Sequence, residues 1–143
     1  MRITELAISA DRLPKASEKA IAEYERKTAA MVAGVNSQML ARSDLKQLIG
    51  PNNVAMMTDN HSNHARFVAS YLTAPDPNQL VETVSWVFKS YMSRGFHQNY
   101  WSAQLNCWIT EMKNKLDEES YGEIYPLYEW FIINIPTFSE MVR

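Results

Sequence analysis

The sequence predicts an all-α protein. Only four glycines occur in 143 residues, and no Asn-Gly or Asp-Gly hairpin signal is present. No stretch sustains the alternation of apolar and polar residues that is typical of strands. Apolar residues instead recur at offsets of three, four and seven, which is the period of an amphipathic helix. We expect a single domain over residues 1–143, with 1–14 as an N-terminal extension and six or seven helices in a bundle.

Composition excludes several classes of protein. The formal net charge is −2 and charged residues make up 21%, so the basic excess of a nucleic-acid-binding surface is missing. One cysteine excludes an internal disulfide and a zinc site built on paired cysteines. No apolar run approaches the roughly 18 residues of a membrane span, and the N-terminus lacks the apolar core of a secretory signal. We expect a bacterial-style cytoplasmic protein.

The N-terminal third predicts a short helix and a long one. Residues 1–13 form the short helix, which ends before the first proline. Ser17 is the expected N-cap of a long helix that runs to about Val35. Gly34 and Asn36 are the expected stop signals of that helix.

The middle of the chain predicts further helices. Residues 37–49 form a shorter helix or two, which end at Gly50-Pro51. Residues 52–74 form the next helix. Its expected inward side comprises Met57, His61, His64, Val68 and Tyr71 or Leu72.

The next stretch reads as two amphipathic helices joined at a glycine. Asp76 is the expected N-cap and Pro77 the first helical residue of a helix that extends to about Ser93. Gly95 then allows the chain to leave the helix in a left-handed conformation. A second helix runs from about Gln98 to Leu116.

The last helix begins after an expected N-cap at Asp117. Pro126 should bend or split it, and Pro136 marks a second break, because proline removes a backbone donor and clashes with the preceding turn. The last two helices carry more aromatic surface than one small core readily hides, which predicts a homodimer through them. This surface comprises Trp108, Met112, Tyr121, Tyr125, Tyr128, Trp130 and Phe131.

The spacing from about Asn60 to Trp108 resembles the globin domains of bacterial globin-coupled sensors. Those domains carry a proximal histidine, a glycine four residues later, and an aromatic pair five or six residues beyond that. The corresponding residues here are Tyr91, Gly95 and Tyr100-Trp101. The resemblance implies a globin-like fold, related to haem-free stress-sensor globins and to the phycobiliproteins, which hold linear tetrapyrroles.

The chain departs from that pattern at the proximal position, where Tyr91 replaces the histidine. Haem held in the ordinary globin way needs an imidazole there. A tyrosinate can ligate ferric haem when a cation holds the phenolate, and Arg94 lies three residues on. His97 is the nearby imidazole that could replace the missing one. As alternatives, Tyr91 is a hydrogen-bonded core tyrosine and His97 is a capping or solvated residue.

The candidate cofactor-binding residues surround this corner. The aromatic ones could line a flat ligand, although such stripes also occur as plain core. Arg66, Lys89 and Arg94 could pair with propionates, or they belong to solvated helix faces. The expected binding set comprises His64, Trp86, Phe88, Tyr91, Arg94, Phe96, His97, Tyr100 and Trp101.

Metal and catalytic sites are not expected. His61 and His64 share a helix face, but two histidines do not make a closed metal site, and His61 is alternatively exposed. Cys107 is expected to be a small buried hydrophobe. No phosphate loop, nucleophile elbow or histidine–carboxylate–cysteine set occurs, so we expect no enzyme.

Two functions therefore remain. The first is a stand-alone tetrapyrrole carrier or sensor that passes its signal to a separate partner. A bilin is preferred over haem, because the proximal histidine is absent, and another apolar small molecule is possible. The second is a ligand-free, dimeric scaffold or signalling module. An open cleft between the His64 and Tyr91 helices favours the first function, and a pocket filled by side chains favours the second.

Overall fold

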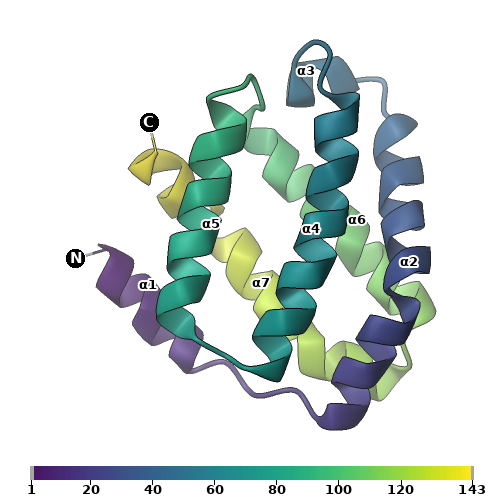
Figure 1. Ribbon diagram of the computed structural model, residues 1–143, viewed down its shortest axis with the longest axis vertical. Coiled ribbons are helices and arrows are strands. Elements are labelled where there is room, and N and C mark those ends of the chain that lie inside the picture. Colours follow the sequence, from purple (N-terminus) through teal and green to yellow (C-terminus); the bar gives the residue numbers. More distant parts are fainter. Residues whose placement is uncertain (1, 143) are drawn as a thin grey trace.

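A computed structural model describes residues 2–142, and that part of the chain is all-α, with seven helices and no strand. The expected fold class and helix number are thus confirmed. In Figure 1, α4 and α5 lie in front of α6 and α7. The helices are α1 (Arg2–Asp11), α2 (Glu18–Leu40), α3 (Leu45–Ile49), α4 (Val54–Thr73), α5 (Pro77–Met92), α6 (Gln98–Lys115) and α7 (Glu118–Met141).

Three helices begin at the predicted N-caps. The side chains of Ser17, Asp76 and Asp117 each accept a hydrogen bond from the backbone N–H three residues on, at 3.1, 3.2 and 2.8 Å. Each bond satisfies one of the free N–H groups in the first helical turn. Pro77 occupies the first turn of α5, where its missing N–H is not needed.

The predicted end of α2 near Val35 is wrong, because the helix continues to Leu40. Gly34 has a packing role inside the helix instead. A Cβ at this position would collide with the Glu111 carboxylate of α6. That carboxylate is buried and accepts a hydrogen bond from Nε2 of Gln38 at 2.7 Å. The glycine therefore lets α6 approach α2 closely.

The predicted split at Pro126 and the break at Pro136 are also wrong, because α7 is one continuous helix from Glu118 to Met141. Proline leaves unpaired the carbonyl of the residue four positions earlier. For Pro126 that residue is Gly122, which lies exposed at the surface, where water can take the place of the missing donor. Apolar residues of α7 that pack into the core keep the helix aligned.

Two glycine corners dock against each other at one end of the bundle. Gly50 follows α3 with φ 78°, and Gly95 follows α5 with φ 105°. A Cβ on Gly50 would lie 3.1 Å from the backbone oxygen of Gly95. Nδ2 of Asn53 donates to the carbonyls of Ile49 and Arg94, at 2.7 and 3.0 Å. This end of α4 is thereby fixed to the end of α5.

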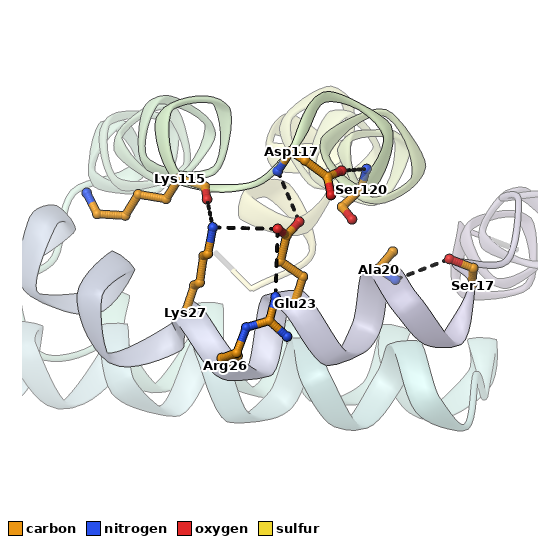
Figure 2. Close-up of polar contacts among 8 residues, drawn as sticks. All are labelled: Ser17, Ala20, Glu23, Arg26, Lys27, Lys115, Asp117 and Ser120. Carbon is orange, nitrogen blue, oxygen red and sulfur yellow. Dashed lines mark hydrogen bonds and ion pairs between the residues drawn. The ribbon is translucent and has the colours of Figure 1, made fainter.

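A polar cluster fixes the opposite end, where α2 meets the turn between α6 and α7 (Figure 2). Glu23 is 7% exposed, and its Oε1 accepts a hydrogen bond from the backbone N–H of Asp117 at 3.0 Å. Lys27 forms an ion pair with Glu23 at 3.5 Å and donates to the carbonyl of Lys115. The exposed Arg26 lies 3.9 Å from the same carboxylate.

The core hides most of the aromatic surface on which the predicted homodimer depended. Only Tyr121 and Tyr125 of that set remain half-buried. The other five are at most 7% exposed within one chain, namely Trp108, Met112, Tyr128, Trp130 and Phe131. The premise that one chain cannot bury them is therefore wrong. Among the described helices, none is long and apolar enough to cross a membrane.

Candidate functional site

A pocket of about 260 Å³ lies between α4 and α5 and is closed by α6 and α7. It forms because α4 packs chiefly against α2, whereas α5 packs against α1 and α7, so the two neighbouring helices are not packed tightly together. The pocket therefore lies between the His64 and Tyr91 helices. Its lining residues are Asn60, Asn63, His64, Phe67, Thr83, Val84, Trp86, Val87, Phe88, Tyr91, Trp101, Gln104, Leu105 and Phe131.

The pocket wall is apolar and aromatic. Phe88 and Trp101 stack with ring centroids 4.5 Å apart, and Tyr91 meets Trp101 edge to face at 5.8 Å. Trp86 contributes from the rim, because its side chain is 65% exposed. Among the described residues 2–142, those that line the pocket include no aspartate, glutamate, lysine or arginine. A ligand in the pocket would thus meet aromatic faces and uncharged polar groups.

His64 is the polar group of the wall with the most constrained setting. Its Nε2 lies 2.8 Å from the hydroxyl of Tyr128, and that hydroxyl lies 2.8 Å from the hydroxyl of Tyr24. Both tyrosines are fully buried. The ring of His64 packs 4.9 Å from Trp108 and 5.9 Å from Phe131, between ring centroids. A hydrogen-bonded chain therefore runs from α2 through α7 to the pocket.

The direction of this chain sets the tautomer of His64. Among the described residues the Tyr24 hydroxyl has no other acceptor than Tyr128, so Tyr24 donates to Tyr128 and Tyr128 donates to Nε2. The ring proton of neutral His64 is then on Nδ1. Burial, with a smaller contribution from His61, lowers the pKa of His64 to about 3. The imidazole is thus neutral near pH 7 and offers one N–H.

His61 belongs to a second buried network and not to the pocket wall. Its Nδ1 lies 2.5 Å from Oδ1 of Asn36, and its Nε2 lies 2.9 Å from the hydroxyl of Tyr100. That hydroxyl also donates to Oδ1 of Asn60 at 2.8 Å. Burial lowers the pKa of His61 to about 4. The alternative of an exposed His61 is therefore wrong, and no group of three metal-ligating side chains occurs in the described part of the chain.

Tyr91 lies in the pocket wall but does not have the setting of an iron ligand. It is 8% exposed, and burial raises the pKa of its hydroxyl against opposing effects of Asn60, Asn63 and the Arg94 charge. The phenolate that iron ligation needs is therefore disfavoured. Arg94 itself is exposed, and its Nη1 lies 3.5 Å from Oγ of Ser90. The charge of Arg94 therefore lowers the pKa of Tyr91 less than burial raises it.

Five of the nine predicted binding residues line the pocket, and four do not. His64, Trp86, Phe88, Tyr91 and Trp101 are in the wall. Phe96 and Tyr100 are buried in the core outside it, and Arg94 is at the surface. The exposed His97 is the N-cap of α6, where its Nδ1 accepts from the backbone N–H of Asn99 at 3.0 Å. The capping alternative for His97 is thus confirmed.

Gln104 is one of nine wall residues that are absent from the predicted binding set, and it is the one with an unpartnered buried atom. It is 2% exposed, and its Oε1 has no hydrogen-bond partner in the part of the chain that the structure describes. Nε1 of Trp101, one turn earlier on α6, also lacks a partner there. A glutamine on the apolar face that carries Trp101, Leu105 and Trp108 is the sequence signal that could have revealed this polar position.

The two predicted iron ligands, Tyr91 and His97, are not placed to hold haem. The imidazole of His97 is outside the pocket, the phenol of Tyr91 is held neutral, and the volume of about 260 Å³ is below the usual range of roughly 300–1,000 Å³ for ligand pockets. Comparison of the chain with family models, with curated proteins and with solved structures found no match.

Proposed function

We propose that this chain is a non-enzymatic binding protein whose pocket encloses a flat, mostly apolar ring of a small molecule. A linear tetrapyrrole that inserts one end is the expected ligand class. The observation that carries the proposal is the aromatic pocket between α4 and α5, into which the chain has not packed enough side chains to fill the space. Protein cores are normally packed without such voids, and an unfilled apolar pocket is the usual form of a ligand site.

The size of the pocket selects among ligands. Its volume of about 260 Å³ suits one or two rings, and the rest of a longer ligand would lie outside along the exposed Trp86. Arg66 is at this rim, since it donates to Oδ1 of the wall residue Asn63. Charged substituents of a bilin could therefore stay in solvent near Arg66 while an end ring is buried.

Spectroscopic titration tests the proposal. Purified protein is titrated separately with biliverdin and with hemin while absorption spectra are recorded. Val84→Trp places a bulky ring where a small side chain lines the pocket, and Val54→Trp is its control on the exposed first turn of α4. We expect a red-shifted, sharpened biliverdin band in the wild type and in Val54→Trp, and its loss in Val84→Trp.

Two results would overturn the proposal. Flat titrations, in which neither pigment changes its spectrum, would show that the ligand is not a tetrapyrrole. Equal pigment binding by Val84→Trp and Val54→Trp would move the binding site away from the pocket. Flat titrations together with a dimer in light scattering at micromolar concentration would favour the alternative, a ligand-free dimeric scaffold. Surface residues available to such a dimer include Ile133, which is 66% exposed on α7.

A further inference from the structure

The ring of His64 is held by the core on one side and open to the pocket on the other. The residue is half-buried, although its neighbours Trp108, Tyr128 and Phe131 are at most 7% exposed. Its Nε2 is bonded to the Tyr128 hydroxyl, which leaves Nδ1 for another partner. Within the described residues, Nδ1 is not among the unpaired polar atoms that are hidden from solvent. The exposed part of the ring therefore includes Nδ1 and opens into the pocket.

The buried tyrosine pair decides what Nδ1 offers. If His64 carried its proton on Nε2, Tyr128 would have to donate to Tyr24, and the Tyr24 proton would have no acceptor among the described residues. Tyr24 is fully buried, and an unpaired group in such a site costs about 1–3 kcal/mol. The opposite direction pairs every proton of the chain and places the ring proton on Nδ1. His64 thus presents a donor to the pocket and no acceptor.

The amide oxygens of the wall do not add a free acceptor. Those of Asn60 and Asn63 already accept hydrogen bonds, from an α6 tyrosine and from a rim arginine. Oε1 of Gln104 has less than 1 Å² of accessible surface and so does not face the pocket. The hydroxyls of Thr83 and Tyr91 can donate or accept, so they favour neither kind of ligand. The group of the wall that discriminates between ligands is therefore the N–H of the imidazole.

On the basis of the proposed function, we infer that the pocket selects an uncharged ring with a hydrogen-bond acceptor, to which Nδ1 of His64 donates. The acceptor is a carbonyl oxygen or an unprotonated ring nitrogen. An anionic acceptor is disfavoured, because the described residues that line the pocket carry no charge to pair with it. Tyr128 and Tyr24 lie outside the wall and are positioning residues, since they hold His64 in the donating tautomer.

Three bicyclic probes of similar size separate acceptors from donors. In mildly alkaline buffer quinoline carries only an acceptor, indole carries only a donor N–H, and naphthalene carries neither. Binding of each probe to the full chain is measured by ligand-observed NMR, with displacement by biliverdin as a check on the site. We expect quinoline to bind at least about fivefold more tightly than indole, because only quinoline pairs with the N–H of His64.

His64→Phe keeps an aromatic ring and removes the donor. We expect it to weaken quinoline by about fivefold and to change naphthalene by less than about twofold. Biliverdin should follow quinoline, because the carbonyl of its end ring is an acceptor of the same kind. His97→Phe makes the same substitution at an exposed position outside the wall and should change none of these affinities. Circular dichroism checks that each variant is folded.

Tyr128→Phe tests the positioning role separately. Without the Tyr128 hydroxyl, the ring proton of His64 is free to move to Nε2, so the preference for quinoline over indole should fall by at least about threefold. Nitrogen NMR of the imidazole rings reads the tautomer directly. We expect the proton on Nδ1 of His64 in the wild type and on both nitrogens in Tyr128→Phe. A change that only lowered stability would leave the tautomer as it is in the wild type.

The outcomes distinguish this inference from the proposed function. Indole that binds as tightly as quinoline, a wild-type proton on Nε2 of His64, or an undiminished preference for quinoline in His64→Phe would each overturn the acceptor selection, while the pocket remains a binding site. If neither the probes nor biliverdin bind, the proposed function fails together with the inference. If biliverdin alone binds, an unchanged affinity in His64→Phe overturns the inference. If a variant fails to fold, the probe order and the tautomer of the wild type still decide.

Discussion

Nε2 of His64 lies 2.8 Å from the hydroxyl of Tyr128, and this bond joins the pocket to the centre of the bundle. The Tyr24 hydroxyl continues the chain at 2.8 Å from the Tyr128 hydroxyl. The three residues come from α4, α7 and α2. The side chain that offers an N–H to the pocket is thus held by α7, which also supplies Phe131 to the wall, and through it by α2, which supplies no wall residue.

Tyr128→Phe should destabilise the protein more than Tyr24→Phe. Removing the Tyr128 hydroxyl leaves both the Tyr24 hydroxyl and Nε2 of His64 without partners inside the core. An unsatisfied buried group costs about 1–3 kcal/mol, so we expect a loss of about 2–4 kcal/mol. Tyr24→Phe removes one end of the chain and should cost about 1 kcal/mol. Urea denaturation measures both free energies of unfolding.

Tyr121→Phe is the control for these two changes, because Tyr121 is a half-buried tyrosine on the same helix as Tyr128. We expect it to change the free energy of unfolding by less than about 0.5 kcal/mol. Equal losses in Tyr128→Phe and Tyr24→Phe would contradict the direction assigned to the chain.

The buried His61 and the half-buried His64 should make stability depend on pH. Their folded pKa values are lowered from 6.5 to about 4 for His61 and about 3 for His64. Above pH 6.5 both histidines are neutral in the folded chain and in the unfolded chain. As the pH falls below 6.5, the unfolded chain binds protons that the folded chain does not, so stability falls by about 1.4 kcal/mol per pH unit for each histidine.

Urea denaturation between about pH 7 and pH 5 measures this slope. In His64→Gln the slope should be about half that of the wild type, because one of the two protonation differences is gone. A free energy of unfolding that stays constant across the same interval would refute the lowered pKa values of both histidines.

The helix caps and the end of α3 could be predicted from sequence because each depends on a few neighbouring residues. Ser17, Asp76 and Asp117 cap whatever helix follows them. Gly34 shows where local reasoning fails. Its place inside α2 depends on Glu111, which is 77 positions later in the sequence and meets it through the packing of α6 on α2. The glycine that locally indicates a helix end is instead required because the Glu111 side chain occupies the space of a Cβ at position 34.

Gly34→Ala should therefore have opposite effects in two backgrounds. In the wild type, the new methyl group displaces the buried Glu111 carboxylate, and overpacking of this kind costs about 1–3 kcal/mol. In a Glu111→Ala background the space is free, and alanine should stabilise α2 by up to about 1 kcal/mol relative to glycine. Thermal or urea denaturation of the four proteins gives the coupling free energy.

Gly122→Ala is the matched control for this cycle. A Cβ at Gly122 meets nothing within 4 Å, and the residue lies in the interior of α7. We expect it to stabilise the protein by about 1 kcal/mol in both backgrounds. If Gly34→Ala also had the same effect with and without Glu111, the close approach of the two helices would not be what requires the glycine.

The pocket could be predicted in part, and the reason lies in helix geometry. His64, Phe88, Tyr91 and Trp101 are on apolar faces, and the periodicity identifies those faces. Which aromatic residues border an unfilled space depends on how far apart α4 and α5 lie, which periodicity does not encode. Tyr100 is thus as buried as Trp101 but belongs to the His61 network.

Glu23→Gln should lower the free energy of unfolding at neutral pH and not at acidic pH. Desolvation opposes the charge of Glu23, but the hydrogen bond from the Asp117 backbone and the nearby Lys27 lower the pKa of this carboxyl below its ordinary 4.5 (Figure 2). Its stabilising effect is therefore present above about pH 4.5 and lost as the pH falls through the folded pKa. We expect a loss of about 1 kcal/mol at pH 7.

Urea denaturation of wild type and Glu23→Gln at neutral pH and near pH 3 measures the difference. Glu25→Gln changes an exposed carboxylate on the same helix and should have little effect at either pH. A difference between Glu23→Gln and the wild type that persisted undiminished at the acidic pH would mean that the charge is not what the α6–α7 turn requires.

Tyr91→Phe should leave hemin spectra unchanged. The hydroxyl of Tyr91 is held in its neutral form by burial, and a neutral phenol does not ligate ferric iron. We expect the wild type and Tyr91→Phe to show the same hemin band positions. We also expect their affinities for hemin to differ by less than about twofold. His97→Ala should behave in the same way, since that side chain caps α6 outside the pocket. A sharp Soret band in the wild type that disappears in Tyr91→Phe would instead show that hemin binding draws the phenolate out of its neutral state, and the preference for an open-chain pigment would then be wrong.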